Sequence, residues 1–195
     1  MGRLTRAESR ERTRRQLLEA AAELFARDGY DATSVEDVAE AAGYSKGAVY
    51  YNFSSKTELF DALVTQHIGE LVFELETALA GAQTIEEKLV AAQRVLTERE
   101  RSKQRHLEFE VFMQAVRDPR VRGTVSGAYQ RMRSAVASLI AEQFSQAGVQ
   151  PPLPPDDLAT VIMAGALGHG MMSAIDPDAV EPGLLPSVVA LLLRP

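Results

Sequence analysis

The segment 45–56 brings together hydroxyl, ammonium, amide and phenol side chains of the kinds that contact nucleic acids. A serine and a lysine in the first turn of a short helix can donate to phosphates and to base edges, and Gly47 would let that helix approach a groove closely. Lys56 lies in the first turn of the next helix, where amide N–H groups and an ammonium can hold one phosphate together. The residues that we expect to act in this way are Ser45, Lys46, Gly47, Tyr50, Tyr51, Asn52 and Lys56.

Two short helices joined by a tight turn would position these side chains. The first helix begins at Thr33 or Ser34, because Thr33 and Glu36 have the spacing of a capping box. Gly43 makes the turn, and Ser45 caps the second helix. A helix-turn-helix of this kind places its second helix in the major groove of DNA, while neighbouring helix ends hold phosphates.

Core packing is the alternative interpretation of the aromatic residues in this segment. Phe53 and one tyrosine of the pair 50–51 have a spacing that suits a buried core as well as a binding surface. A core does not explain Lys46 beside Gly47, nor the six arginines that precede them in residues 1–15.

The net charge of −6 is distributed unevenly along the chain. Residues 1–56 hold nine basic and nine acidic side chains, whereas the rest of the chain holds 12 basic and 18 acidic ones and carries the whole negative charge. This distribution suits a small anion-binding head on an acidic body. We expect Arg3 and Arg6 to steer association with DNA or to enter a flanking minor groove.

Helical periodicity and capping residues predict an all-α chain. The long helix after residue 55 has two partly apolar faces, as expected of a helix that bridges two modules. The proline-rich stretch 150–155 is expected to be a non-helical connector. The sequence shows no strand alternation, hairpin dipeptide or internal repeat. The expected helices cover residues 13–27, 33–42, 46–52, 55–80, 84–96, 107–116, 121–147, 157–175 and 187–193.

Several soft or aromatic side chains lie on later helices that are expected to converge. Methionine and phenylalanine are typical of adaptable cavities for small molecules, although ordinary core packing explains each of them equally well. His67 lies on an apolar helix face, where it is either a satisfied core histidine or a group that points into such a cavity. The candidate pocket residues are His67, Phe109, Phe112, Met113, Tyr129, Met132 and Met163.

The helices expected at 121–147 and 157–175 are the candidates for dimerisation. Small residues along the second of them, such as Gly165, permit close helix approach, and its uncharged surface needs a partner. An intramolecular core would also bury this surface. The stretch 158–175 suits a membrane span less well, because it falls short of the roughly 20 apolar residues required and contains glycines and His169.

Residues 29–59 also match the pattern of a known family. The chain resembles the TetR-type (tetracycline-repressor-like) transcriptional regulators, in which Gly-Tyr or Gly-Phe follows the first helix. Their helix-turn-helix then reads Ala-Gly-x-Ser-x-Gly-x-x-Tyr-x-x-Phe-x-x-Lys-x-x-Leu. One departure is Asn52, which stands where many members have an aromatic residue or histidine. The matching residues are Gly29, Tyr30, Thr33, Ser34, Val38, Ala39, Ala42, Gly43, Ser45, Gly47, Tyr50, Phe53, Lys56 and Leu59.

The resemblance implies a cytoplasmic, homodimeric regulator, a repressor that a small apolar ligand releases from a palindromic double-stranded DNA operator. It implies an N-terminal arm and helix-turn-helix DNA-binding domain at residues 1–56, and a helical ligand-binding and dimerisation domain at 57–195. By the same resemblance, the residues expected to contact bases are Lys46, Gly47, Tyr51 and Asn52. The resemblance implies phosphate contacts from Thr33, Ser45, Tyr50 or Tyr51, and Lys56, and Ser34 is a further expected DNA-binding residue.

Catalysis and metal binding are not indicated by the sequence. The chain has no cysteine, and its three histidines lie far apart and outside any His-Glu-x-x-His or Glu-x-x-His motif. We therefore expect no enzyme activity, no cofactor, no metal site and no membrane partner. A helical ligand-binding or sequestration protein is the alternative from another class, since the charge balance of residues 1–56 also suits contacts with protein.

Overall fold

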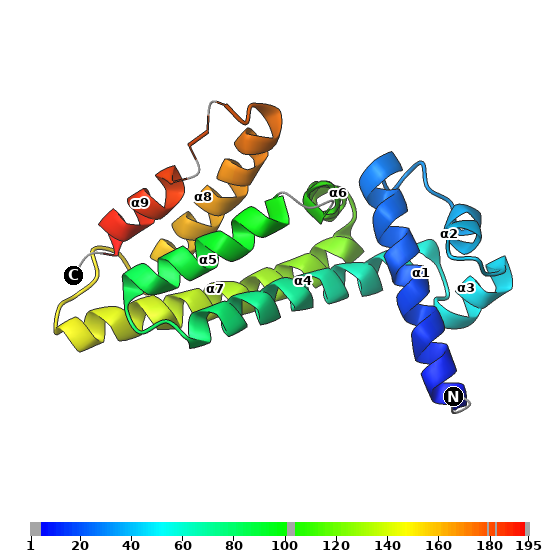
Figure 1. Ribbon diagram of the computed structural model, residues 1–195, viewed down its shortest axis with the longest axis horizontal. Helices are drawn as coiled ribbons and strands as arrows, with labels where there is room; N and C mark the ends of the chain where they lie inside the picture. Colours follow the sequence, from blue (N-terminus) through cyan, green and yellow to red (C-terminus); the bar gives the residue numbers. More distant parts are fainter. Residues whose placement is uncertain (1–4, 101–103, 179, 182, 194–195) are drawn as a thin grey trace. The chain divides into compact units, whose positions relative to one another are not determined.

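The computed structural model describes residues 5–100, 104–178, 180–181 and 183–193, and its regular secondary structure is helical (Figure 1). No strand occurs among these residues, which confirms the all-α prediction. The helices are α1 (Arg6–Asp28), α2 (Val35–Ala41), α3 (Lys46–Asn52), α4 (Lys56–Ala80), α5 (Ile85–Glu100), α6 (Gln104–Arg117), α7 (Pro119–Ala147), α8 (Pro155–Ile175) and α9 (Leu184–Leu192).

The described residues form two compact units. The first unit takes its residues from Met1–Gly69 and Arg101–Ser126, so that α1, α2, α3, α6, the first half of α4 and the start of α7 pack together. The second takes them from Glu70–Glu100 and Gly127–Pro195, and holds the rest of α4 and α7 together with α5, α8 and α9. Packing thus groups α6 with the N-terminal helices. The division of function after residue 56 stays a prediction.

α1 begins at Arg6, earlier than the predicted start at Thr13, because Thr5 caps it. The Thr5 hydroxyl accepts the backbone N–H of Glu8 at 3.2 Å, and the Glu8 carboxylate accepts the backbone N–H of Thr5 at 2.7 Å. This capping box makes most of the basic arm helical. Arg3, for which we expected steering or a minor-groove contact, lies outside the described residues.

The predicted helix-turn-helix is formed by α2, a turn at Gly43 and α3. Ser34 caps α2 in place of the predicted Thr33 box: its hydroxyl accepts the Asp37 N–H at 3.1 Å, and the Asp37 carboxylate accepts the Ser34 N–H at 2.7 Å. Gly43 has a φ of 73°, a left-handed conformation that glycine adopts without strain. Ser45 caps α3 as predicted, with its hydroxyl accepting a backbone N–H at 3.2 Å.

An apolar core joins α1, α2, α3, α6 and the first half of α4, and holds the helix-turn-helix in place. The rings of Phe25, Tyr30 and Phe60 form its aromatic centre, with ring centroids 4.8, 5.4 and 5.5 Å apart. Aromatic pairs at such distances stabilise a fold by about 0.5–1.5 kcal/mol beyond the burial of apolar area. Other fully buried members of this core are Leu17, Val38, Val49, Phe53, Leu59 and Val64.

The second unit has a core of its own, in which Ile140 of α7, Leu158 of α8 and Val189 of α9 are buried. α8 begins at Pro155, the last residue of the expected connector, because proline suits the first turn of a helix, where N–H groups have no intrahelical acceptor. By length and composition α8 could cross a membrane. Only 11% of its most apolar 18-residue stretch is buried within the structure. A large apolar surface of α8 is therefore exposed.

Candidate nucleic-acid interface

α3 turns one face toward the core and leaves the other in solvent. Val49 is buried, and Phe53, which follows the helix, is 1% exposed. Phe53 is therefore a core residue, which was one of the two interpretations of the aromatic residues in this segment. Both tyrosines are exposed, Tyr51 to 73%. Tyr50 and Tyr51 are adjacent on this short helix, and their exposed rings are available for binding. The exposed residues of α3 are Lys46, Gly47, Tyr50 and Tyr51.

Lys46 is the cation at the N-terminal end of α3, where it forms an ion pair with Glu36 of α2. Its ammonium also lies 5.8 Å from the ring centroid of Tyr50. The hydrogen bond to Glu36, together with the charge of that carboxylate, raises the pKa of Lys46, so the side chain is cationic at neutral pH. Both members of the pair are 54% exposed, which allows Lys46 to exchange Glu36 for a group on DNA.

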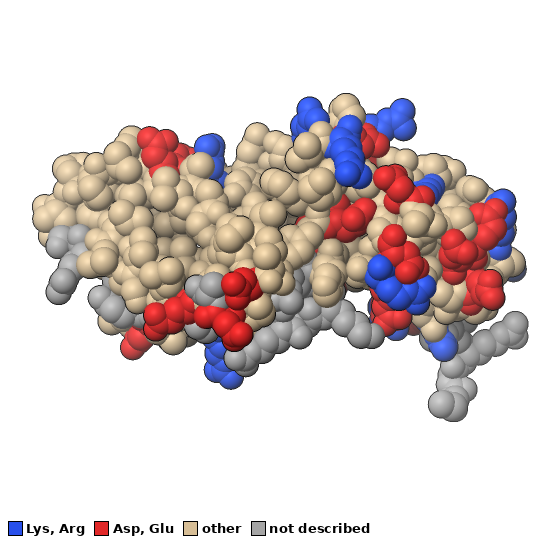
Figure 2. Space-filling model, turned by 90° about the horizontal axis from the view of Figure 1, so that it is seen from above, with Lys and Arg blue, Asp and Glu red and all other residues tan. Residues whose placement is uncertain are grey.

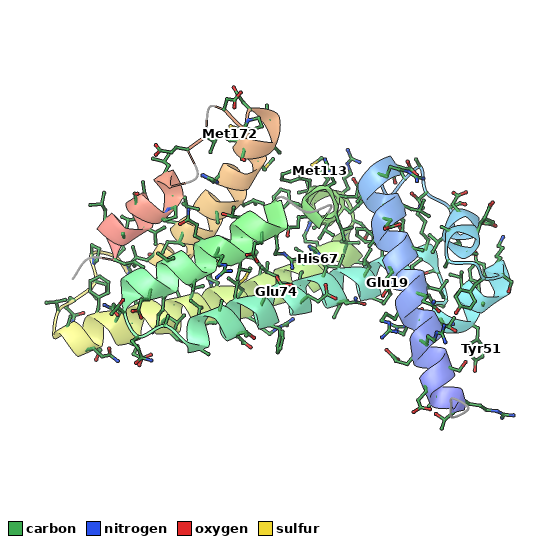
Figure 3. The ribbon with its side chains drawn as sticks, in the orientation of Figure 1. Glu19, Tyr51, His67, Glu74, Met113 and Met172 are labelled. Carbon is green, nitrogen blue, oxygen red and sulfur yellow. The ribbon has the colours of Figure 1, made fainter. Side chains whose placement is uncertain are left out.

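Two arginines of α1 that the sequence pattern did not single out contact the C-terminal part of the helix-turn-helix. The Arg14 guanidinium donates to the backbone carbonyl of Asn52 at 3.2 Å and lies 4.3 Å from the ring centroid of Phe53. The Arg10 guanidinium lies 5.5 Å from the ring centroid of Tyr51, whose side chain is labelled in Figure 3. Their i, i+4 spacing puts both arginines on one face of α1 and is the signal that could have found them. α1 thus adds positive charge beside the exposed tyrosine.

Lys56 is the first residue of α4, and its side chain is partly buried beside the turn between α1 and α2. The ammonium lies 4.2 Å from the ring centroid of Tyr30 and 3.4 Å from the carbonyl oxygen of Asp31. Partial burial lowers the pKa of Lys56, and the negative charges of Asp31 and Asp37 partly offset this effect. A cation at the amide end of a helix is the arrangement expected of a phosphate contact.

Asn52 and Thr33 lack the exposure that their predicted DNA contacts require. The Asn52 side chain is 7% exposed, and its amide donates to the carbonyl of Ala48 at 2.8 Å. This burial contradicts the predicted base contact, because position 52 lies on the same face of α3 as the buried Val49. Thr33 is 3% exposed and its hydroxyl donates to the carbonyl of Gly29 at 2.9 Å, so that side chain is committed to the turn.

The seven candidate pocket residues are divided between the two units. His67 and three residues of α6 belong to the first unit, where Phe112 and Met113 are 40% and 44% exposed. The second unit holds the other three, Tyr129, Met132 and Met163, of which Met163 is buried and the other two are partly buried. Burial also raises the pKa of the Tyr129 phenol. A pocket shared by all seven stays a prediction.

His67, labelled in Figure 3, is buried in the first unit at 6% exposure. Its Nε2 lies 3.4 Å from a carboxylate oxygen of Glu108 on α6. A buried histidine beside a carboxylate fits the core-histidine interpretation. Over the part of the chain that the structure describes, no group of three or more histidine or acidic side chains is placed to hold a metal ion.

Two family models match the chain. Residues 17–63 match the bacterial regulatory proteins of the tetR family, and residues 85–194 match the C-terminal region of the BetI-type transcriptional repressors. The first match covers the second half of α1 and all of α2 and α3, and the second alone covers more than half of the 195 residues. These matches confirm the family resemblance of the motif residues.

Two known regulators are similar to this chain in sequence. The HTH-type transcriptional regulator AcrR of Shigella flexneri is 38% identical over 84 residues, which are 42% of this chain and 39% of that protein. The HTH-type transcriptional activator FasR of Mycolicibacterium smegmatis is 40% identical over 83 residues, 43% of this chain and 38% of that protein. The alignments therefore span about two fifths of the length of these relatives.

The fold is shared more widely than the sequence. A transcriptional regulator from Saccharomonospora viridis, solved in complex with choline, superimposes with a TM-score of 0.77 at 21% identity, over 94% of this chain and 96% of that chain. The two family matches, the helix-turn-helix and the all-helical fold lead to one assignment: the chain belongs to the TetR family of bacterial regulatory proteins.

Proposed function

We propose that this protein is a transcriptional repressor that reads duplex DNA with α3 and leaves its operator when a small molecule binds. The exposed face of α3 carries the proposal, since Lys46, Gly47 and Tyr51 lie in solvent on the second helix of a helix-turn-helix. The match to a BetI-type transcriptional repressor region supports repression as the direction of control.

The residues of this surface divide into base-reading and phosphate-binding groups. Lys46 suits the oxygen and nitrogen acceptors of guanine in the major groove, Gly47 allows close approach, and Tyr51 reaches base edges or thymine methyl groups. Phosphates carry no sequence information, and their contacts fix the register of the protein on the duplex. The phosphate group consists of Ser34, Ser45, Tyr50 and Lys56, to which Arg10 adds charge from α1.

We infer that the protein acts as a homodimer formed through α7 and α8. Val161, Met172 and Ile175 of α8 are 52%, 54% and 75% exposed, and removing such apolar surface from water favours association. On the face that Figure 2 shows, a large area of the second unit carries no charged side chain. A two-fold axis would place the two α3 helices in half-sites centred about 34–36 Å apart on a near-palindromic operator.

A small apolar ligand in the second unit is the proposed signal. Tyr129, Met132 and Met163 supply aromatic and soft surface for it, and the choline complex of the Saccharomonospora viridis regulator supports small-molecule binding by proteins of this fold. Coupling between ligand and DNA would be worth about 1–3 kcal/mol, or about 5–150-fold in affinity. We expect the protein to act in the cytoplasm, where such an operator lies, and to need no cofactor.

Salt-dependent binding to duplex DNA tests this function. An operator duplex would first be selected from a random pool, and its affinity for the full chain measured against salt concentration. Lys56→Ala should weaken binding to all duplexes alike and lower the slope of log affinity against log salt by about 1, as expected for one lost phosphate contact. Lys88→Ala on α5, a matched change in the second unit, should leave the slope unchanged. Absence of salt-dependent binding by the unchanged chain would refute the proposal.

A further inference from the structure

A carboxylate of α6 holds the turn that precedes the helix-turn-helix. Glu110 Oε1 accepts the backbone N–H of Tyr30 at 2.7 Å, across 80 residues of sequence and within the first compact unit. Gln114, one turn later on α6, donates to the same oxygen at 3.2 Å and thereby orients the carboxylate. A hydrogen bond to a charged acceptor is shorter and stronger than a neutral one. The α1–α2 turn is thus anchored directly to α6.

Tyr30 carries this anchor into the N-terminal helices. Its ring packs against Phe25 and Phe60, and its hydroxyl lies 3.3 Å from the hydroxyl of Thr57 in the first turn of α4. The ammonium of Lys56 lies over the same ring at 4.2 Å. A shift of the Tyr30 backbone would therefore move the proposed phosphate-binding lysine and the residues that seat it.

The same turn also sets the start of α2. Gly29 ends α1 with a φ of 85°, and its carbonyl accepts the hydroxyl of Thr33, the residue before the Ser34 cap. Arg117 at the end of α6 lies 3.6 Å from the carboxylate of Asp31, the residue after Tyr30. α6 therefore contacts the turn at two points, of which the Glu110 bond is the shorter and less exposed.

The contact between Glu110 and Tyr30 joins residues that belong to two different family matches. Residues 104–117 lie within the match to the BetI-type C-terminal region, whereas Tyr30 lies within the tetR-family match at 17–63. We propose that Glu110 is a positioning residue that couples α6 directly to the helix-turn-helix, by a route that does not pass along α4. This inference rests on the proposed DNA binding.

Reciprocity makes the coupling measurable with DNA as the only ligand. If α6 and the DNA-binding surface are coupled, binding of DNA stabilises α6 by the same free energy with which α6 stabilises the bound surface. Amide hydrogen exchange reports such local stability. In the unchanged full chain, the selected operator duplex should slow exchange in α3 and also in α6, the latter by about fivefold for a coupling at the low end of the usual range.

Substitutions at Glu110 separate the direct route from a general effect. Glu110→Ala should keep the slowing in α3 and lose it in α6, while exchange at the Tyr30 amide becomes faster. Glu110→Gln should retain the slowing in both helices, because its amide oxygen still accepts the Tyr30 N–H. Glu76→Ala, at an exposed carboxylate of the second unit, is the matched control and should behave as the unchanged chain.

The outcomes of this experiment distinguish failure of the Glu110 coupling from failure of the proposed DNA binding. If DNA slows amide exchange in α6 of the Glu110→Ala variant as much as in the unchanged chain, direct coupling through Glu110 is overturned while DNA binding stands. If the unchanged chain shows no slowing in α3, DNA binding itself fails and the coupling fails with it. Should Glu110→Ala not fold, Glu110→Asp keeps the charge but withdraws it by one methylene group, and the same readouts decide.

Discussion

The ammonium of Lys46 on α3 is paired with the carboxylate of Glu36 on α2, so the proposed base-reading cation already has an anionic partner in the absence of DNA. Both side chains are 54% exposed, and exposed pairs of this kind contribute only about 0–1 kcal/mol to stability. The pair therefore matters more for binding than for folding. It orients Lys46 across the turn, and it competes with DNA for the ammonium.

Glu36→Gln should tighten binding to duplex DNA. The substitution removes the competing charge and its repulsion of phosphates, and we expect about two- to fivefold higher affinity at low salt, with a smaller gain as salt screens the field. Fluorescence anisotropy with a labelled duplex measures the change. Glu40→Gln, at another exposed carboxylate in the last turn of α2, tests whether the effect belongs to the Lys46 pair or to net charge alone. Weaker binding by Glu36→Gln would show that the pair serves mainly to orient Lys46.

Arg14→Ala should destabilise the first unit. The substitution removes the hydrogen bond to the Asn52 carbonyl and the stacking over Phe53, which together are worth about 1–2 kcal/mol. We expect Tm to fall by about 3–6 °C in thermal unfolding followed by circular dichroism. Arg12→Ala, at an exposed arginine of α1, should change Tm little. Equal Tm values for the two variants would contradict the contacts assigned to Arg14.

The capping contact between Ser34 and Asp37 should make the free energy of unfolding depend on pH. Hydrogen bonds from the side chain and then the backbone of Ser34 lower the pKa of the Asp37 carboxyl below its ordinary value. Because the folded chain holds the proton less tightly, this contribution is present above the unfolded pKa of about 3.9 and is lost as pH falls through the lowered folded pKa. Ser34→Ala should move the pKa of Asp37 upward in a carboxyl NMR titration. An unchanged pKa would remove Ser34 as its cause.

Local capping signals predicted much of this fold, and their failures have physical causes. Ser45 and Gly43 formed the turn as expected because each acts through its own backbone neighbourhood. The start of α1 was missed because its first turns carry no large apolar residue to establish a period, although Thr5 and Glu8 have the spacing of a capping box. At α2 two overlapping boxes were possible, and burial of Thr33 selected the one at Ser34.

The sequence predicted where the candidate interface lies along the chain, but not how α3 is rotated about its axis. A helix as short as α3 spans only two turns, so periodicity leaves its rotation open, and packing against the core turned Asn52 inward and both tyrosines outward. The contacts of Arg14 with α3 and of Glu110 with Tyr30 span 38 and 80 residues. No local pattern encodes contacts of that range, since they depend on tertiary packing.

Val161→Asp on α8 should convert the proposed dimer to a monomer. A carboxylate placed at the centre of an apolar interface must be desolvated without a partner, which costs several kcal/mol per buried charge. Sedimentation velocity should show a shift from the dimer mass to that of the 21.3 kDa chain. Val116→Asp on α6, also at an exposed valine, should remain dimeric. A dimer that survives Val161→Asp would move the interface away from this face of α8.

Sequence discrimination by Lys46 tests the central claim, that α3 reads base edges, most directly. The ratio of affinities for the selected operator and for a duplex with scrambled half-sites would be measured for the unchanged chain and for Lys46→Ala, at one salt concentration. A base contact is worth about 1–3 kcal/mol of discrimination, so we predict that the ratio falls by about 5–150-fold in the variant. A ratio that Lys46→Ala leaves unchanged, even if both affinities fall together, would contradict base reading by Lys46 and reduce it to a phosphate contact.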